Sequence, residues 1–513
     1  MNRRTMAVLI LVSWAASLGW LGLRRFSVPT ETDLGDRRTR LAPLASFYAV
    51  MAGDVQVGTA GITLDTTALG YRLTEALSLD LPQAGSTRQV LQLESVLSRS
   101  LRLQQATASL SERGSSYSLE ARPGQDSGFV IRSGRGGVNR DLLERFPPVA
   151  GLTVSGAMAF ELAASGRLRP RGSIATAILD PLSRSAWTGV AETVSDSVLT
   201  ASDSATFDPG IGRWVAVAPD SVRAWRVLRR DRGLPVREWI DGQGRVLRRE
   251  QAFGLTLEHS PFEVNYTNYR ADLQRGTRPP QARLSGTTRL VDLDRRPDTT
   301  AGAVRVLVRR LDGTAWPGSA AAFEGGRQSS AGDTVVIRST PEGADSATPT
   351  RWRNTPGRSA SDSAALQRAL QEALDADPGE PDTLRRLVTR VAHGVRYLDR
   401  QTEPTGFLTV LRDRRAGLEG KVALMVALAR QAGYPARAVT GVDVSDSTLP
   451  AHSWVEVWRD GWQTVDPVFG NVPASAYLLR VTEGTGAHPL VLVPLIGGLR
   501  TTLLSPAPGN GRR

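Results

Sequence analysis

The hydrophobic pattern of the chain changes its period across the stretch from Thr340 to Ser363, which is rich in Pro, Gly, Ser, Thr and Asp. Before this stretch, apolar residues come in short runs separated by turn residues, as in β-strands; after it, they recur at helical spacing. The stretch itself has the composition of a linker. A chain of 513 residues has room for more than one core. The pattern therefore predicts an α+β protein, with β-rich antiparallel domains before the linker and a mixed domain after it.

The β-rich part carries two hairpin signals. Phe47 to Asp65 alternates around a Gly-Asp turn, and Val236 to Glu250 alternates around a turn at Asp241 to Gly244. Together with other short strands at similar spacing, they predict one large antiparallel sheet or an open barrel. Two segments, Arg140 to Phe146 and Val154 to Ala164, fit a helix or a strand by their period.

An uncharged segment, Met6 to Leu23, lies near the N-terminus between two pairs of arginines, Arg3-Arg4 and Arg24-Arg25. Its eighteen residues reach the short end of a membrane span, and its apolar core is longer than that of a secretory signal. We therefore expect a transmembrane signal anchor, with the bulk of the chain extracytoplasmic, in the periplasm or at the cell surface. A cleaved signal is the alternative.

The net charge of +12 comes almost wholly from arginine, since Lys421 is the sole lysine of the chain. The arginines are scattered and accompanied by Asp and Glu, so they form no basic stripe of the kind that binds nucleic acid. The chain has no cysteine, which excludes disulfides, thiolate metal sites and thiol catalysis. No His, Asp and Glu spacing matches a metal site, and we expect neither a metal nor a cofactor.

Three helices are predicted after the linker. Leu366 to Leu374 has an amphipathic pattern, and Asp382 caps a second amphipathic helix. The third helix runs from Glu419 to Ala432 and stops at Gly433. Because it is apolar on most of its surface, we expect it to be a buried central helix, and we expect Lys421 to be solvated on it.

Two strands predicted after the central helix carry His452 on the first and Asp466 at the end of the second. A thiol hydrolase places its nucleophile at the N-terminus of a buried helix, where a nearby His takes its proton and a third group fixes the His tautomer. The chain has the helix, the His and the Asp in that order, but no thiol.

Residues from about 384 to 476 resemble the bacterial transglutaminase-like family of the papain-like superfamily. That family has segments of the forms V-x-x-x-V-R-Y, G-x-P-A-R-x-V-x-G, H-x-W-V-E-V and G-W-x-x-x-D-P. The matching positions are Val391, Val395, Arg396, Tyr397, Gly433, Pro435, Ala436, Arg437, Val439, Gly441, His452, Trp454, Val455, Glu456, Val457, Gly461, Trp462, Asp466 and Pro467. The resemblance implies a papain-like domain in which His452 and Asp466 stand at the positions of the catalytic His and Asp.

The nucleophile segment of the family, G-D-C-x-x-x-A, is where this chain departs. With Gly417 on the family Gly, Glu419 falls at the Cys position; counting back from Gly433 places Leu418 there instead. In neither register is the nucleophile retained. A carboxylate at a helix N-terminus is favoured by the helix dipole. Beside a protonated His452, Glu419 would form an ion pair in place of a thiolate–imidazolium pair.

Three tryptophans, Trp454, Trp458 and Trp462, frame the strands that carry His452 and Asp466. Their positions fit a buried core, and the resemblance also allows them to line a ligand-binding cleft. The predicted domains are 1–26 (signal anchor), 27–275 (β-rich exported domain), 276–340 (second β-type segment), 341–363 (linker), 364–495 (transglutaminase-like domain) and 496–513 (tail).

The sequence supports three hypotheses of function. The first is a membrane-anchored envelope protein whose transglutaminase-like domain binds a peptide, a protein or a cell-wall component without cleaving it, as a pseudoenzyme. The second is an active hydrolase or acyltransferase that uses Glu419, His452 and Asp466. The third is a scaffold in which the β-rich domain binds the ligand.

Overall fold

The computed structural model describes residues 41–52, 55–80, 88–112, 115–125, 128–134, 142–182, 184–231, 234–250, 255–275, 291–292, 302–310, 327–339, 352–353, 360–398, 405–445, 451–483 and 499–506. The expected signal anchor lies outside the described residues. Within these ranges, no helix has both the length and the apolar character needed to cross a membrane.

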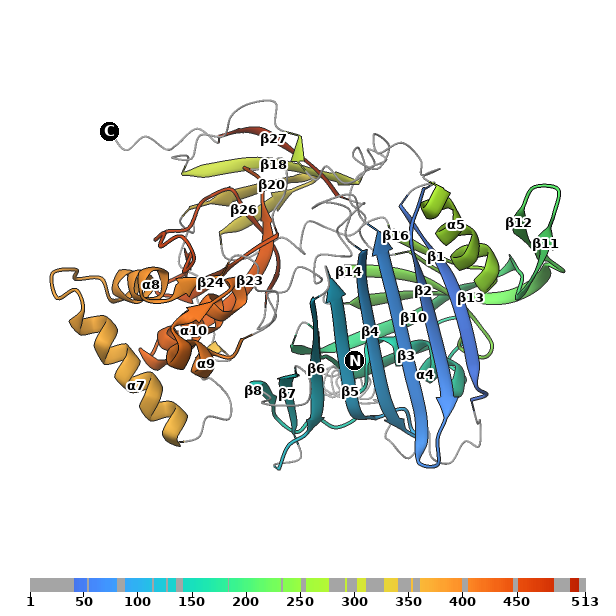
Figure 1. Cartoon of the computed structure of the whole chain (residues 1–513), viewed down its shortest axis with the longest axis horizontal. Coiled ribbons are helices and arrows are strands. Elements are labelled where there is room, and N and C mark those ends of the chain that lie inside the picture. The colour runs from blue at the N-terminus through green and yellow to red at the C-terminus, as the bar shows by residue number, and fades with distance from the viewer. Residues whose placement is uncertain are drawn as a thin grey trace, which may run out of the picture.

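A fourteen-stranded antiparallel sheet forms the first part of the molecule (Figure 1). The bounds of its strands are β1 Leu44–Ala52, β2 Val55–Thr66, β3 Gly70–Asp80, β4 Arg88–Ser98, β5 Leu103–Glu112, β6 Ser115–Pro123, β7 Phe129–Gly134, β8 Leu142–Phe146, β9 Ser173–Asp180, β10 Ser185–Ala201, β13 Asp220–Asp231, β14 Leu234–Asp241, β15 Val246–Glu250 and β16 Leu255–His259. Their order in space is β8-β7-β6-β5-β4-β3-β2-β1-β16-β15-β14-β13-β10-β9, so most neighbours in space are also neighbours in sequence. One large antiparallel sheet is what the sequence predicts for this part.

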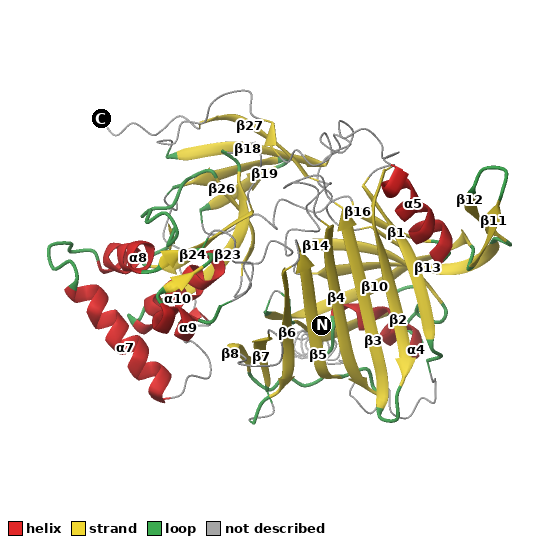
Figure 2. Ribbon diagram, in the orientation of Figure 1, coloured by secondary structure: helices red, strands yellow, loops and turns green. Residues whose placement is uncertain are grey.

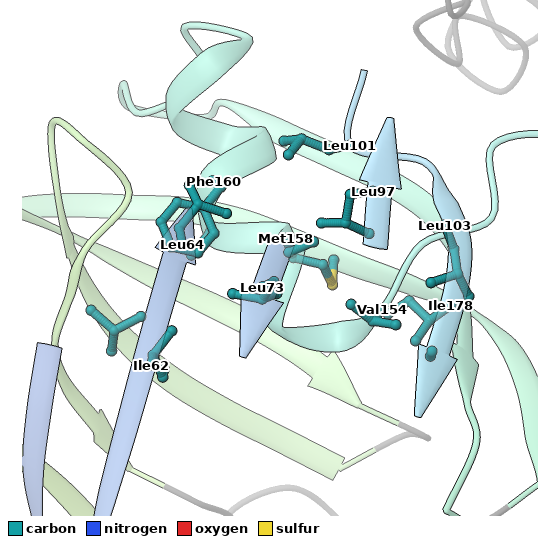
Figure 3. Close-up of a cluster of buried hydrophobic side chains, with 14 of the residues drawn as sticks. Ile62, Leu64, Leu73, Leu97, Leu101, Leu103, Val154, Met158, Phe160 and Ile178 are labelled. Atoms are coloured by element: carbon teal, nitrogen blue, oxygen red, sulfur yellow. The ribbon is translucent and has the colours of Figure 1, made fainter. Parts of the chain in front are cut away.

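The sheet curls around one apolar core, which is shared by strands far apart in its order (Figure 3). Leucines of β2 and β4 and an isoleucine of β9 belong to the same buried cluster. The segment that follows β8 closes the curl through backbone hydrogen bonds. Leu103 of β5 donates to the carbonyl of Leu152 at 2.7 Å, and Thr153 donates to the carbonyl of Ala177 in β9 at 2.8 Å.

A short helix packs inside the curl, formed by η1 (Ser155–Ala157) and α4 (Met158–Ala164). Met158 and Phe160 are buried in the core (Figure 3). Gly244, in the turn between β14 and β15, lies so close to Phe160 that a Cβ would be 2.9 Å from its ring, and its φ is +88°. The sequence left two segments open between helix and strand. The structure shows strand β8 in Arg140 to Phe146, and it shows η1 and α4 in Val154 to Ala164.

Both predicted hairpins form, as β1–β2 and β14–β15. Asp241 stabilises the second turn, because its Oδ1 accepts the backbone N–H groups of Gln243 and Arg245, each at 2.9 Å. A further hairpin, β11 (Ser204–Asp208) with β12 (Arg213–Val217), lies between β10 and β13 in sequence. After β16 the chain forms η2 (Glu263–Thr267) and α5 (Asn268–Arg275).

A second sheet contains five strands in the order β17-β27-β18-β20-β19. Their bounds are β17 Val291–Asp292, β18 Ala303–Arg310, β19 Gln328–Ala331, β20 Thr334–Arg338 and β27 Leu499–Pro506. β27 lies within 496–513, and it pairs with β18 along its length. The prediction of a tail over 496–513 was wrong, because this range contains a paired strand. The sequence did not indicate the strand, since its partner β18 is distant in sequence and no local turn signal marks such a pairing.

The C-terminal domain combines helices with a four-stranded sheet in the order β25-β24-β23-β26 (Figure 2). Its elements are α7 Ala360–Asp375, α8 Thr383–Gly394, β21 Arg396–Tyr397, α9 Phe407–Asp413, β22 Arg415–Ala416, α10 Leu418–Gln431, β23 Ala436–Asp443, β24 Ala451–Trp458, β25 Trp462–Val465 and β26 Leu478–Glu483. The Asp382 carboxylate caps α8 by accepting the N–H of Leu384 at 2.9 Å. The helix predicted to be central is α10, which packs against α7, α8, α9, β23 and β24.

Candidate functional site

His452 and Asp466 are brought together by neighbouring antiparallel strands. His452 lies in β24, and Asp466 follows the last residue of β25. The distance from His452 Nε2 to Asp466 Oδ2 is 2.7 Å. The other carboxylate oxygen accepts the backbone N–H groups of Val468 at 2.9 Å and Phe469 at 3.2 Å. The turn after β25 holds the carboxylate in place. With the imidazole hydrogen on Nε2, His452 donates a hydrogen bond to this carboxylate, so the orientation of the imidazole is fixed.

The imidazole of His452 is flanked by two aromatic rings. The Trp454 ring lies at 6.4 Å and the Phe469 ring at 5.5 Å between centroids, both close to parallel with it. The side chain of His452 is 11% exposed and that of Asp466 is 3% exposed, whereas Phe469 is 68% exposed. Little of the pair therefore faces solvent.

Helix α10 begins at Leu418, with Gly417 as its N-cap. The transglutaminase-like family has its nucleophile at this end of the helix. Leu418 is partly buried and packs against the apolar core of the domain. Lys421 follows Leu418 by three residues and therefore lies on the same side of the helix, whereas Glu419 is turned away from that side.

Glu419 forms an ion pair with Arg184 of the large sheet. Arg184 Nη2 lies 3.3 Å from Glu419 Oε2, and the two side chains are 5% and 10% exposed. Arg184 occupies the turn between β9 and β10 with a φ of +50°. Burial raises the pKa of the Glu419 carboxyl, and the Arg184 guanidinium opposes this effect. Among the described residues, Glu419 Oε1 has no hydrogen-bond partner.

Lys421 is 1% exposed, so the expectation of a solvated lysine was wrong. Its Nζ donates a hydrogen bond of 2.7 Å to the carbonyl of Ala392 in α8 and lies 5.8 Å from the centroid of the Tyr397 ring. Burial lowers the pKa of Lys421, and the Asp466 carboxylate opposes this effect. The ammonium group therefore contributes positive charge to the surroundings of Asp466.

A second buried charge cluster lies in the sheet around Glu456. Arg437 Nη2 is 2.6 Å and Arg480 Nη1 is 3.4 Å from its carboxylate. Although burial opposes ionisation, Arg480 and Arg437 keep the pKa of Glu456 below its ordinary value. These residues orient β23, β24 and β26 relative to each other.

The three tryptophans are buried in the domain. Trp454 is 0%, Trp458 7% and Trp462 6% exposed. Trp458 and Trp462 meet edge to face at 5.5 Å, and the Arg437 guanidinium lies 4.0 Å from the centroid of the Trp462 ring. In this structure they are core residues, and a role in binding a ligand stays a prediction.

The structure thus brings His452 and Asp466 together and directs Glu419 to a different partner. Among the described contacts, none joins Glu419 to His452, so the assignment of Glu419 to the family Cys position stays a prediction. Sequence reasoning missed Arg184 altogether. The turn residues Asp180-Pro181 indicate that the chain reverses there, but no local signal shows that this turn meets α10.

A model of the transglutaminase-like superfamily matches residues 367–467, which contain α10, His452 and Asp466. The chain carries a transglutaminase-like domain. This domain lacks a cysteine, retains the His–Asp pair at hydrogen-bonding distance, and has an interdomain ion pair at the N-terminus of its central helix.

Solved structures show distant likeness to the chain, and no curated protein matches it. A β-barrel-like protein with the domain of unknown function DUF1849 from Brucella abortus has 9% identity and a TM-score of 0.32, over 44% of this chain and 98% of that one. The periplasmic domain of TgpA from Pseudomonas aeruginosa has 23% identity and a TM-score of 0.20, over 27% of this chain and 53% of that one. The chain therefore spans about half of the TgpA domain.

Proposed function

We propose that the protein is a membrane-anchored envelope protein whose transglutaminase-like domain is a non-catalytic binding module. The bulk of the chain would be extracytoplasmic, held by the uncharged segment Met6 to Leu23. Its ligand would be a peptide, a protein or a cell-wall component that is held and not cleaved.

The observation that carries the proposal is the buried Arg184–Glu419 pair at the start of α10. A nucleophile needs access to substrate and an adjacent base. Here the first turn of the helix offers an aliphatic side chain at Leu418 and a carboxylate already engaged at Glu419. The retained His452–Asp466 pair would then act as a structural hydrogen bond in a covered site.

The test measures turnover by the purified full-length chain. Hydrolysis of labelled casein and incorporation of a labelled amine into casein are followed for wild type, Glu419→Gln and His452→Ala. We expect no turnover above buffer in any of the three. Wild-type turnover that is lost in both variants would overturn the proposal and support an acid–base hydrolase that uses Glu419, His452 and Asp466.

A matched pair of variants distinguishes the two registers. Leu418→Cys and Glu419→Cys each introduce a single thiol into a chain that has none. Thiol-dependent turnover in one of them would identify the residue that faces His452. We expect it in Leu418→Cys, because Lys421 on the same side of α10 lies within electrostatic reach of Asp466.

The Arg184–Glu419 contact also favours a second candidate, a scaffold in which the β-rich domain binds the ligand and the transglutaminase-like domain supports it. Sedimentation with purified cell-wall polymer decides between the two. Binding that survives deletion of residues 361–513 supports the scaffold, and binding that is lost while the remaining chain stays folded supports the C-terminal module.

A further inference from the structure

A cavity of about 280 Å³ lies between helices α7, α8, α9 and α10, on the helical side of the transglutaminase-like domain. The apolar lining residues that keep some exposed surface are Ala365, Ala369, Leu408 and Leu411. Four further lining residues are buried and present almost no surface to the cavity: Val391, Val410, Leu424 and Leu428. The volume corresponds to about nine water molecules at roughly 30 Å³ each. The cavity is therefore large enough for a small organic molecule.

The rim of the cavity is strongly basic. Four arginines line it, together with a single carboxylate, Glu372; the arginines are Arg368, Arg390, Arg412 and Arg414. Glu372 lies 2.8 Å from the Arg390 guanidinium and 3.6 Å from that of Arg414, so one carboxylate is shared by two cations. Arg412 pairs with Asp413 next to it. Four guanidinium groups against two carboxylates leave the rim with an excess of two positive charges.

Arg368 has no ion pair or hydrogen bond among the described residues. It lies one helical turn before Glu372 on α7, and its side chain is exposed at the mouth of the cavity. A guanidinium group binds a carboxylate or a phosphate through two parallel hydrogen bonds. The Arg368 guanidinium can therefore bind an anion from solvent through two hydrogen bonds, and no ion pair with a protein carboxylate has to be broken first.

From the apolar lining and the basic rim, we infer that the cavity binds a small amphipathic anion, with its carboxylate or phosphate head at Arg368 and its hydrocarbon body on Ala365, Ala369, Leu408 and Leu411. Ligand sites commonly combine an apolar lining with a few polar groups that orient the ligand. The site lies on the face of α10 that packs with α7, α8 and α9, and it does not depend on the His452–Asp466 pair.

The experiment uses octanoate as the probe and isothermal titration calorimetry of the full-length chain as the measurement. Octylamine and 1-octanol carry the same hydrocarbon chain with a cationic or neutral head, acetate carries the head without the chain, and octyl phosphate tests the other anionic head. We expect octanoate or octyl phosphate to bind at one site per chain, and we expect the other three to bind at least about tenfold more weakly.

Two variants and one control locate the site. Arg368→Glu should weaken binding of the octyl anion at least about tenfold, and Ala369→Phe, which fills the cavity from α7, should abolish it. Arg385→Glu makes the same charge change at an exposed position of α8 outside the lining, and it should bind as wild type does. If Ala369→Phe does not fold, Arg368→Glu decides. The inference fails if neither octyl anion binds, if octanol binds as tightly as the anions, or if Arg368→Glu and Arg385→Glu behave alike.

Discussion

The Glu419 carboxylate and the Arg184 guanidinium are both removed from water at the first turn of α10. Desolvation of two ions costs several kcal/mol each, and their attraction offsets this only when the geometry is good and all hydrogen-bonding groups are satisfied. Here the pair has one contact at 3.3 Å, and Glu419 Oε1 has no partner among the described residues. The attraction of Arg184 offsets only part of the cost of burying the carboxylate, so the pKa of Glu419 is raised in spite of the adjacent arginine.

The raised pKa of Glu419 makes stability depend on pH. The protonated carboxyl is favoured in the folded state, so its contribution is fully present below about pH 4.5, the value for the unfolded chain, and is lost as pH rises through the folded pKa. Glu419→Gln keeps a neutral side chain at every pH. We therefore expect its free energy of unfolding to increase relative to that of wild type as pH rises above 4.5, measured by urea titration with tryptophan fluorescence.

Glu372→Gln serves as the control for this titration, since Glu372 is about half exposed. The comparison separates burial at Glu419 from the replacement of a carboxylate by an amide. A Glu419→Gln difference that is flat, or that falls as pH rises, would contradict the assignment of a raised pKa.

Lys421 gives a direct measure of burial, because it is the sole lysine of the chain. With its amine buried and donating to Ala392, we expect an amine-reactive reagent to label Lys421 at least about a hundredfold more slowly in the folded protein than in denaturant, which corresponds to an opening free energy of about 3 kcal/mol. Mass spectrometry of the peptide that contains Lys421 measures the rate, and the α-amino group of the chain provides the internal reference. Equal rates with and without denaturant would show that the amine is accessible.

At the scale of elements, the β9–β10 turn and α10 form a junction between the large sheet and the transglutaminase-like domain. Arg184→Ala leaves a buried carboxylate without its partner, so we expect it to destabilise the chain by about 3 kcal/mol at pH 7. In a double-mutant cycle with Glu419→Ala, the coupling should be about 1–3 kcal/mol, measured by urea unfolding.

An exposed ion pair of the same sheet provides the comparison. Arg223 and Asp196 pair at 2.9 Å with side chains 65% and 50% exposed, and their cycle should give a coupling below about 1 kcal/mol. If the Arg184–Glu419 cycle gives no larger value than this, the buried junction does not stabilise the molecule.

The sequence predicted the elements whose signals are local. The Asp241 turn, the Asp382 cap and the apolar surface of α10 each act within a few residues, and the motif order brought His452 and Asp466 onto neighbouring strands. Lys421 was misjudged, because a lysine is rarely buried and its acceptor, the Ala392 carbonyl, belongs to another helix. The contact of Arg184 with Glu419 could not be predicted for the same reason, because it depends on how two segments that are distant in sequence pack together.

At the scale of the whole molecule, side-chain hydrogen bonds to backbone groups attach the five-stranded sheet to the transglutaminase-like domain. Arg327 Nη1 donates to the carbonyl of Ser475 at 2.6 Å and Nη2 donates to that of Leu478 at 2.8 Å. Gln328, at the start of β19, exchanges hydrogen bonds with the backbone of Arg480 in β26. Burial lowers the pKa of Arg327 to about 10, which still leaves it charged at neutral pH. The domain is therefore supported by Arg184 from one part of the chain and by Arg327 from another.

β27 makes this support testable, since it lies between β17 and β18 in the five-stranded sheet. Deleting residues 496–513 removes β27 and its ladder with β18, so we expect a loss of at least about 2 kcal/mol, or about 5 °C in melting temperature, measured by calorimetry. Deleting 507–513 keeps β27 and should leave the melting temperature within about 1 °C of wild type. Since Arg327 and Gln328 belong to the same assembly, the longer deletion should also speed the labelling of Lys421. Equal stability of the two truncated chains would show that β27 does not support the domain.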